Sequence, residues 1–247
     1  MDHELKKLLL EQGASMVGFA RIEGLYNKVD MEGPRSEDSE TEPFEIPEYP
    51  YGISIILAYP REIIRGIHDE PTMEYYNAYN HNKHQLDDLM MKCADYIKSQ
   101  GYNAYAQTGD VKEFGIFRTI MPNKTVAVKA GLGWIGKSAL FITEDFGSAV
   151  RLGSVLTDMP VPCPETIFQS RCGSCMLCTK ACPGGAISGR NWSPDLDRDD
   201  FYDAMACRKK AREIAARVLN KKATLCGKCM EVCPYTRRYT EAVLSNT

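Results

Sequence analysis

Cysteine is concentrated in the last third of the chain, where it forms two short runs. The first run, in RCGSCMLCTKACPGGAI, contains Cys172, Cys175, Cys178 and Cys182 at spacings of three, three and four residues, and Pro183 follows. The pattern C-x2-C-x2-C-x3-C-P is typical of chains that bind cube-shaped iron–sulfur clusters, in which three cysteines wrap one cluster and the fourth ligates another. One such run therefore predicts a second set of ligands.

The second run, in LCGKCMEVCPY, provides part of that set. Its cysteines repeat the last three of the first pattern and again end in proline, but Ala223 stands where the first cysteine would be. Cys207, in the helical-looking stretch before this run, replaces the missing ligand and brings the count to eight. Crossed ligation then predicts two [4Fe-4S] clusters. Cluster one takes Cys172, Cys175, Cys178 and Cys233, and cluster two takes Cys182, Cys207, Cys226 and Cys229.

Other uses of these cysteines fit the sequence less well. A disulfide framework belongs to small secreted chains, whereas this chain has 247 residues, is 44% hydrophobic and begins without a signal sequence, so we expect a soluble cytoplasmic protein with reduced thiols. Pairs of C-x2-C also suit zinc, but zinc sites have no use for paired Cys-Pro endings. Cys93 recurs with apolar residues at helical spacing and is expected in a core, and Cys163 has no assigned role.

A glycine-rich loop, in AGLGWIGKSALFITEDFGSAVRLGSVLTD, matches two nucleotide-binding patterns. Gly131, Gly133 and Gly136 fit the dinucleotide fingerprint, and Gly136-Lys137-Ser138 completes a P-loop pattern. Both patterns need a strand before the loop and a helix after it, yet the residues after Ser138 favour a strand at 139–143, a turn at 144–147 and another strand at 149–156. Two alternatives stay open: a tight chain reversal beside the core, and a backbone that faces a cofactor.

This loop followed by the first cysteine run resembles the epoxyqueuosine reductase family, with the reductive dehalogenases as more distant relatives. The resemblance covers about residues 50–236. It implies a base-off cobalamin and two [4Fe-4S] clusters, with the corrinoid on a nitroreductase-like mixed α/β sandwich next to a ferredoxin-like module. By this similarity the corrinoid or substrate pocket is lined by Gly131, Gly133, Trp134, Gly136 and Lys137, with Tyr75 and Tyr76.

The residues alone support plainer roles for some of these positions. Tyr75, Tyr76 and Tyr79 share one face of an expected helix and can pack there, and His81 and His84 are expected in solvent rather than on a metal.

The chain departs from the family pattern at the expected general acid. The family carries an aspartate in a DSAP-like segment before the glycine loop, but this chain has FRTIMPNKTVAVKAGLGW, with no acid between Phe114 and Gly133. Asp110 or Glu113 can substitute, and the spacing favours neither. The chain ends 14 residues after Cys233, so the helical extension that holds tRNA in many members is not expected, and a tRNA substrate is disfavoured. No twin-arginine signal of the dehalogenases is present.

The remaining patterns predict an α+β fold in two domains. Strands are expected in SMVGFARI, YGISIILAY and YNAYAQT, and a long helix around residues 72–99. Prolines at 160, 162 and 164 mark the boundary between a corrinoid- or substrate-binding domain, 1–160, and a ferredoxin-like domain, 161–247. The net charge is −3, and basic residues gather only at 207–222 and in TRRY, so no broad nucleic-acid surface is expected.

Three functions compete on this sequence. The first is a cytoplasmic reductase that takes electrons from a ferredoxin or flavodoxin, relays them through two clusters to cobalamin and reduces a small molecule. The second is an electron-transfer protein that activates the corrinoid of a partner protein. The third is a cobalamin carrier or sensor whose clusters report redox state. No membrane partner is expected.

Overall fold

The computed structural model describes residues 2–26, 48–108, 119–164 and 169–241. These residues divide into two compact units. The first comprises residues 1–57, 83–132 and 152–167, and the second comprises 58–82, 133–151 and 168–247. Each unit is thus assembled from three separate segments of the chain, whereas the sequence predicts one boundary near residue 160.

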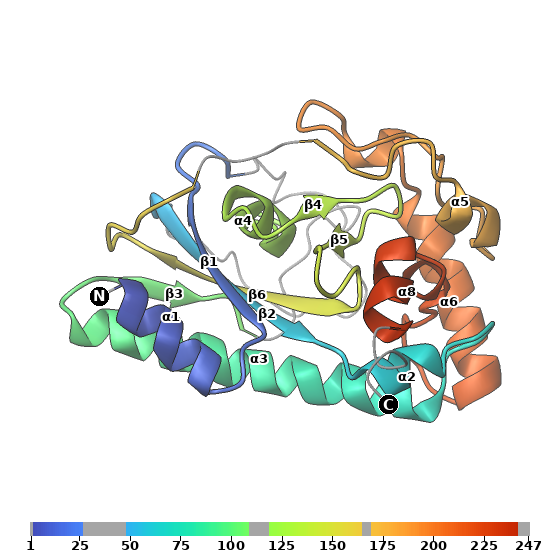
Figure 1. Ribbon diagram of the computed structural model, residues 1–247, viewed down its shortest axis with the longest axis horizontal. Coiled ribbons are helices and arrows are strands. Elements are labelled where there is room, and N and C mark those ends of the chain that lie inside the picture. The colour runs from blue at the N-terminus through green and yellow to red at the C-terminus, as the bar shows by residue number, and fades with distance from the viewer. Residues whose placement is uncertain (1, 27–47, 109–118, 165–168, 242–247) are drawn as a thin grey trace. The chain divides into compact units, whose positions relative to one another are not determined.

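Unit one is built on a four-stranded sheet of order β1-β2-β6-β3 (Figure 1). The strands are β1 (Met16–Arg21), β2 (Tyr51–Ala58), β3 (Ala104–Ala106) and β6 (Val150–Thr157). β1 pairs antiparallel with β2, with Val17 opposite Ile55, and β3 pairs antiparallel with β6. The three N-terminal strands expected from the sequence are confirmed, and so is the strand expected at 149–156.

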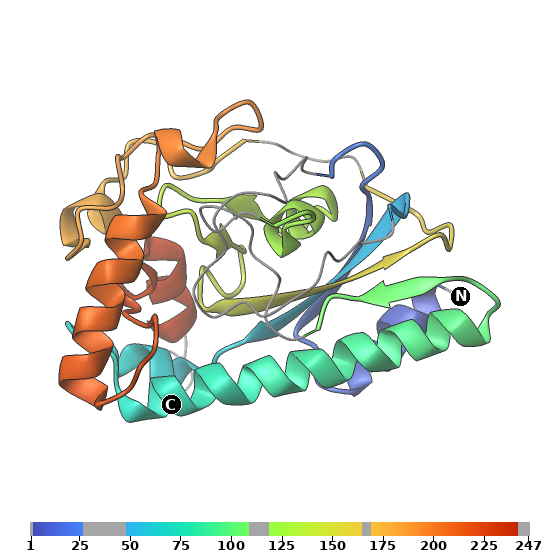
Figure 2. The same ribbon diagram turned by 180° about the vertical axis from the view of Figure 1, so that it is seen from behind.

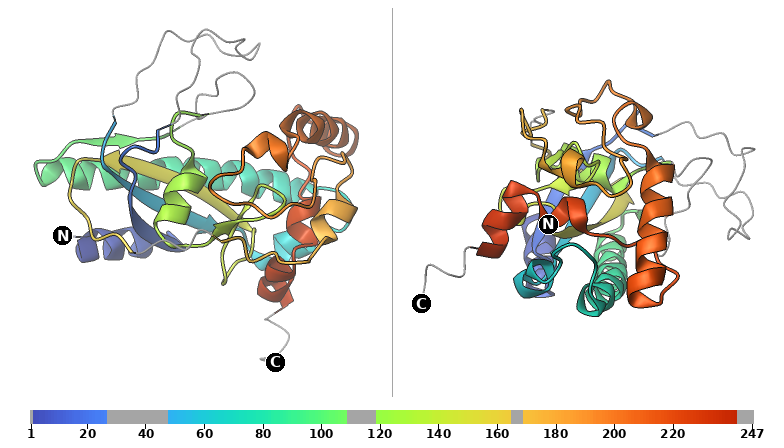
Figure 3. Two further views of the ribbon diagram at one scale, coloured as in Figure 1. Left: turned by 90° about the horizontal axis from the view of Figure 1, so that it is seen from above. Right: turned by 90° about the vertical axis from the view of Figure 1, so that its right-hand side faces the viewer.

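Helices pack on both faces of this sheet (Figures 1 and 3). The helices are α1 (Asp2–Glu11), the part of α3 (Met73–Ser99) that belongs to this unit, and α4 (Asn123–Lys129). Because strand side chains alternate between faces, Ile53 and Ile55 meet Leu5 and Leu89 from α1 and α3. On the opposite face, Ala20 and Leu156 pack with Val126 of α4. Cys93 is fully buried in the first of these cores, as the sequence predicts.

Unit two contains the cysteine-rich chain together with two segments from before residue 160. Its elements are α2 (Arg61–Arg65), the start of α3, β4 (Trp134–Ile135), β5 (Phe141–Ile142), α5 (Leu177–Ala181), the 3₁₀ turn η1 (Arg198–Asp200), α6 (Ala204–Leu219), α7 (Lys228–Glu231) and α8 (Pro234–Glu241). Its apolar core joins Tyr59, Ile67 and Tyr75 to Leu219 and Met230. The 58–82 segment thus supplies core that the polar cysteine runs lack.

Specific contacts fix the 58–82 and 133–151 segments in the same unit. Ser148 N donates to Thr236 Oγ1 at 3.0 Å, and the Tyr239 hydroxyl donates to the carbonyl of Tyr59 at 2.8 Å. A Cβ on Gly147 would lie 2.2 Å from the backbone nitrogen of Thr236, so only glycine permits this approach. Within the described residues, no helix is long and apolar enough to cross a membrane.

Candidate metal centre and glycine loop

The four cysteines assigned to cluster one are neighbours in unit two. A turn in which Cys175 N donates to Cys172 O at 3.0 Å begins the run, and α5 then carries Cys178. The pKa of the Cys178 thiol is raised by burial first and then by the nearby thiols of Cys172, Cys233 and Cys175. Cys233, which precedes α8, has its pKa raised by burial and by Cys172. Segments more than 50 residues apart in sequence therefore meet here.

The four cysteines assigned to cluster two form a second set of neighbours. Burial raises the pKa of Cys226, and the thiols of Cys207 and Cys182 raise it further. The pKa of Cys229 is also raised by burial first and then by the nearby thiols of Cys207, Cys226, Cys178 and Cys182. Cys178 and Cys229 are thus in electrostatic range of one another, and the two sets adjoin.

The environment of these thiols decides what they can do chemically. Burial disfavours the thiolate, and each thiolate would also repel its neighbours, so ionising the thiols of one set requires a positive partner among them. Iron in a cluster supplies that charge and prefers thiolate ligands. The described residues contain no group of three or more His, Cys, Asp or Glu side chains that could hold a metal ion as placed. The chemistry of the donor set, thiols from two cysteine runs that lie near one another, fits [4Fe-4S] clusters.

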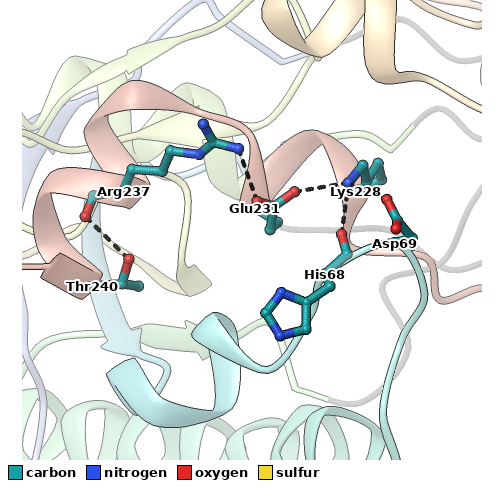
Figure 4. A network of polar contacts seen from close by, with 6 residues as sticks. All are labelled: His68, Asp69, Lys228, Glu231, Arg237 and Thr240. Atoms are coloured by element: carbon teal, nitrogen blue, oxygen red, sulfur yellow. Dashed lines mark hydrogen bonds and ion pairs between the residues drawn. The ribbon is translucent and has the colours of Figure 1, made fainter.

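Lys228, between Cys226 and Cys229, anchors the second cysteine run (Figure 4). Its ammonium donates to the carbonyl of His68 at 2.6 Å and to the carboxylates of Asp69 and Glu231 at 3.0 Å each. Burial alone would lower the pKa of Lys228, but the hydrogen bonds to Asp69 and Glu231 outweigh burial and raise it. This network ties α7 to the 58–82 segment of the same unit.

The glycine loop follows helix α4 and leads into the short β4–β5 hairpin. A helix before the loop and a hairpin after it reverse the order that a nucleotide-binding loop requires. A Cβ on Gly133 would lie 2.0 Å from the carbonyl oxygen of Ile142, and one on Gly136 would lie 2.4 Å from Ile142 Cδ1 and 3.4 Å from Cys172 Sγ. These two glycines permit close packing within the hairpin and against the cluster-one run. The predicted strand at 139–143 is reduced to Phe141–Ile142.

Lys137 lies beneath the cluster-one cysteines. Only 3% of its surface is exposed, and its Nζ donates to the carbonyl of Cys175 at 3.0 Å and lies 3.6 Å from Met176 Sδ. It makes no salt bridge with the described carboxylates. A buried ammonium without a protein counter-ion is costly, and an anionic cluster held by Cys175 would compensate it.

Trp134 is also occupied by protein contacts. Its ring is 3% exposed, meets Tyr235 edge-on at 4.8 Å between centroids, and is covered by the Arg171 guanidinium at 5.3 Å. The indole N–H finds no acceptor within the described part of the chain. The side chains of Trp134 and Lys137 thus contact the cysteine module, and their predicted corrinoid role stays a prediction.

The other residues predicted for the pocket have separate surroundings. Gly131 adopts a left-handed φ of +70°, and a Cβ there would lie 3.3 Å from Pro164 in unit one. Tyr75 is buried near the Cys229 and Cys226 thiols of unit two, and Tyr76 lies under the Lys221 ammonium at 5.8 Å. His81 and His84 are exposed, as expected. Asp110 and Glu113, the substitute acids, lie outside the described residues.

Two further residues beside the cysteines, Tyr202 and Lys228, are not identified as functional from the sequence. The Tyr202 hydroxyl hydrogen-bonds to the thiol of Cys207, and burial and that contact both raise the pKa of Tyr202. Nothing in the spacing of Tyr202 indicates this role. Lys228 could have been suspected from its place inside a C-x2-C pair, but its partners come from a segment 160 residues earlier.

Comparison with known proteins agrees with the cysteine pattern. Residues 171–236 match a family described as "4Fe-4S double cluster binding domain". Over 119 residues the chain is 40% identical to an epoxyqueuosine reductase of Listeria monocytogenes, which covers 45% of this chain and 29% of that protein. The chain thus spans less than a third of that curated relative. The motif and a substantial stretch of sequence are shared.

Solved structures share the fold over nearly the whole chain. An epoxyqueuosine reductase from Streptococcus thermophilus is 21% identical, with a TM-score of 0.58, covering 96% of this chain and 66% of that one. A reductive dehalogenase, whose structure suggests a mechanism for B12-dependent dehalogenation, is 20% identical with a TM-score of 0.68, covering 98% of this chain and 33% of that one. The chain is therefore similar in sequence to epoxyqueuosine reductases over part of its length, shares its fold with them and with reductive dehalogenases, and contains a match to a 4Fe-4S double cluster binding domain.

Proposed function

We propose that the protein is an iron–sulfur oxidoreductase that relays single electrons through two [4Fe-4S] clusters. The observations that carry this proposal are the match of residues 171–236 to a 4Fe-4S double cluster binding domain and the proximity of the cysteine thiols of both runs to one another in unit two. Cluster one takes Cys172, Cys175, Cys178 and Cys233, and cluster two takes Cys182, Cys207, Cys226 and Cys229. Cys178 and Cys229, one from each set, are in range of one another, which favours transfer between the clusters.

The chain's own residues adapt the two sites to charged clusters. Lys137 places a buried positive charge under the cluster-one run, and the Tyr202 hydroxyl donates a hydrogen bond to the cluster-two ligand Cys207. A positive charge or a hydrogen bond near the sulfurs stabilises the reduced, more negative cluster and raises its potential. Both clusters are thereby tuned to accept electrons.

A cobalamin, base-off when bound, is the proposed acceptor, with a small organic molecule as the substrate. The support is the resemblance of the glycine loop to epoxyqueuosine reductases, together with the likeness in fold to a reductive dehalogenase whose structure suggests a mechanism for B12-dependent dehalogenation. We propose that the sheet unit is the nitroreductase-like sandwich that this resemblance implies. A reduced corrinoid supplies a strong cobalt reductant for such chemistry. We assign no proton donor, because Asp110 and Glu113 lie outside the described residues.

A second function is favoured by the contacts of the glycine loop. The loop side chains predicted to face a corrinoid, those of Trp134 and Lys137, are buried against the cysteine module. A protein that only passes electrons to the corrinoid of a partner protein needs no such pocket. Cobalamin titration separates the two functions, because only the first predicts stoichiometric binding.

Anaerobic reconstitution tests the relay. We expect about eight irons per chain and a broad visible absorbance that bleaches with dithionite. Cys207→Ala removes a ligand of cluster two alone, so about half of the iron and of the bleaching amplitude is expected to remain. Cys163→Ala, a matched change at a cysteine outside both sets, should retain all of it. Stoichiometric zinc without iron, or equal iron in both variants, would contradict the proposal.

A further inference from the structure

Helix α6 carries a concentration of positive charge that the two clusters do not explain. From Ala204 to Lys222 the chain has seven Lys or Arg residues and one Glu, whereas the whole chain has a net charge of −3. The rest of the protein is therefore clearly acidic. A local field of opposite sign on an acidic protein is a feature of surfaces that select a charged partner.

The helix presents this charge to solvent on one face. Ala211, Ile214, Ala215 and Leu219 are buried and fix the inner side. Asp203 caps the N-terminus by accepting from Ala206 N at 2.8 Å, and Asn220 ends the helix in a left-handed conformation. Figure 2 shows α6 as the long orange helix at the outer edge of its unit. Its basic face consists of the exposed Lys209, Arg212 and Arg217, continued by Lys221 and Lys222.

Part of this charge has no counter-ion. Arg217 pairs with Glu70, and Lys210 pairs with Glu213 at 2.6 Å. Among the salt bridges of the described ranges, none involves Lys209, Arg212 or Lys222. Lys209 contributes to lowering the pKa of Glu213, but less than Lys210 does, so these ammonium and guanidinium groups can still pair with carboxylates of another protein.

The same helix carries the cluster-two ligand Cys207. Met205, two residues earlier, is 54% exposed, although methionine is usually buried. The chain after Cys182 packs tightly on α6, since a Cβ on Gly184 would lie 3.1 Å from the Ala206 carbonyl and from Lys210 Cβ. An apolar side chain and a row of cations thus surround the place where α6 enters the cluster-two ligand set. Small electron-transfer interfaces have this composition, an apolar centre with a charged rim.

We propose that the basic face of α6 is the docking surface for a small acidic electron-carrier protein and that electrons enter the protein at cluster two. The inference rests on the proposed function, because it requires cluster two to be present. In the step itself one electron leaves the reduced flavin or iron–sulfur group of the donor and reduces cluster two, with no bond made or broken. The acidic carrier is attracted by α6 and repelled by the remaining acidic surface, which orients it.

A nucleic acid is the other polyanion that such a face can attract. The described geometry favours the protein donor for two reasons. The basic face is confined to one helix and the two lysines after it, and Glu213 lies in its middle. Phosphate backbones are bound by broader, uninterrupted basic surfaces.

Stopped-flow reduction of the reconstituted protein by an acidic flavodoxin, reduced beforehand, tests the proposal. The variant is Lys209→Glu/Arg212→Glu, and the matched control is Lys6→Glu/Lys7→Glu on α1, which changes the net charge equally. At low ionic strength we expect the α6 variant to be reduced roughly tenfold more slowly than the wild type and to lose most of its salt dependence. The control should behave as the wild type does or slightly worse, because it only adds negative charge.

Two further measurements make each outcome decisive. Dithionite is not a protein and should reduce wild type and both variants to the same extent; if it bleaches no cluster in the wild type, the proposed function fails. If dithionite bleaching is normal but the flavodoxin rate is equal in all three proteins, the docking surface is refuted while the relay stands. If the α6 variant instead loses binding to tRNA in a gel-shift assay and keeps its flavodoxin rate, the face is a nucleic-acid site and the proposal is overturned.

Discussion

Replacing Lys137 by methionine tests whether the buried ammonium is the counter-ion of cluster one. In the wild type the Lys137 ammonium donates a hydrogen bond to the carbonyl of Cys175 at 3.0 Å. Methionine keeps most of the side-chain volume and removes the charge. Reduction adds one negative charge to the cluster. For a charge separation set at about 8 Å and an effective dielectric constant of about 20, Coulomb's law gives about 2 kcal/mol for this extra charge. For one electron that corresponds to a fall of roughly 90 mV in the cluster-one potential.

The assay is a redox titration of the reconstituted protein followed by electron paramagnetic resonance, which separates the two reduced clusters. One cluster should shift to a lower potential, and the other should shift much less. Lys137→Arg, which keeps the charge, is the control and should stay near the wild-type potential if the arginine is accommodated. Unchanged potentials in the methionine variant, with both clusters assembled, would refute the assignment of Lys137 as a counter-ion.

Four other predictions follow from single residues. Tyr202→Phe removes the hydrogen bond to Cys207 and should lower the potential of cluster two by about 40 mV, the equivalent of about 1 kcal/mol, in the same titration; a shift confined to the other cluster would contradict it. Lys228→Met leaves its carboxylate partners without the ammonium and should reduce the free energy of unfolding by about 1–2 kcal/mol in urea, so an unchanged midpoint would argue against the network. In the folded holoprotein a thiol reagent at pH 8 should label about one cysteine, the exposed Cys163, which borders a pocket of about 250 Å³. Cys93 should stay unlabelled, because burial raises its pKa and keeps the thiol protonated. The raised pKa also makes the folding stability depend on pH: the contribution of the protonated Cys93 thiol is complete below its unfolded pKa and is lost as the pH rises toward its folded pKa. Cys93→Val has no such thiol, so its free energy of unfolding should fall less above pH 9 than that of the wild type.

Much of the metal centre is predictable from the sequence. Only cysteine provides the thiolates that an iron–sulfur cluster needs, and a short C-x2-C step leaves the chain few ways to turn, so spacing alone predicts a double-cluster domain, which the family match confirms, and proposes its ligands. Cys207, which lies in no motif, is assigned by the count of eight; the structure brings it near Cys226 and Cys229, and its role as a ligand stays a prediction. The strands of unit one are also predictable from local sequence. Short apolar stretches such as 53–56 favour strands, and Ile53, Ile55 and Ile56 are fully buried in the structure.

The glycine loop shows where local pattern is insufficient. Gly133 and Gly136 take part, with Gly131, in matches to nucleotide motifs and in the corrinoid resemblance, because in each of these glycine lets the backbone approach a neighbour closely. The neighbour that each glycine approaches, Ile142 for both and Cys172 for the second, is decided by how the hairpin folds back on the cysteine run. Lys137 likewise gives no sign in sequence that its ammonium is buried rather than exposed.

The sequence by itself determined that this chain has eight cysteines in a double-cluster pattern, with a sheet-forming region before them. Only the tertiary structure decided which residues surround the cysteines, because the cysteine-rich segment has too few apolar side chains to form a core of its own. Segments 58–82 and 133–151 complete the unit that contains the cysteine-rich segment. Tyrosine and isoleucine side chains of 58–82 pack against α6 and α7. Such contacts join residues more than 100 positions apart, and their partners are chosen by shape and burial, which no local spacing records.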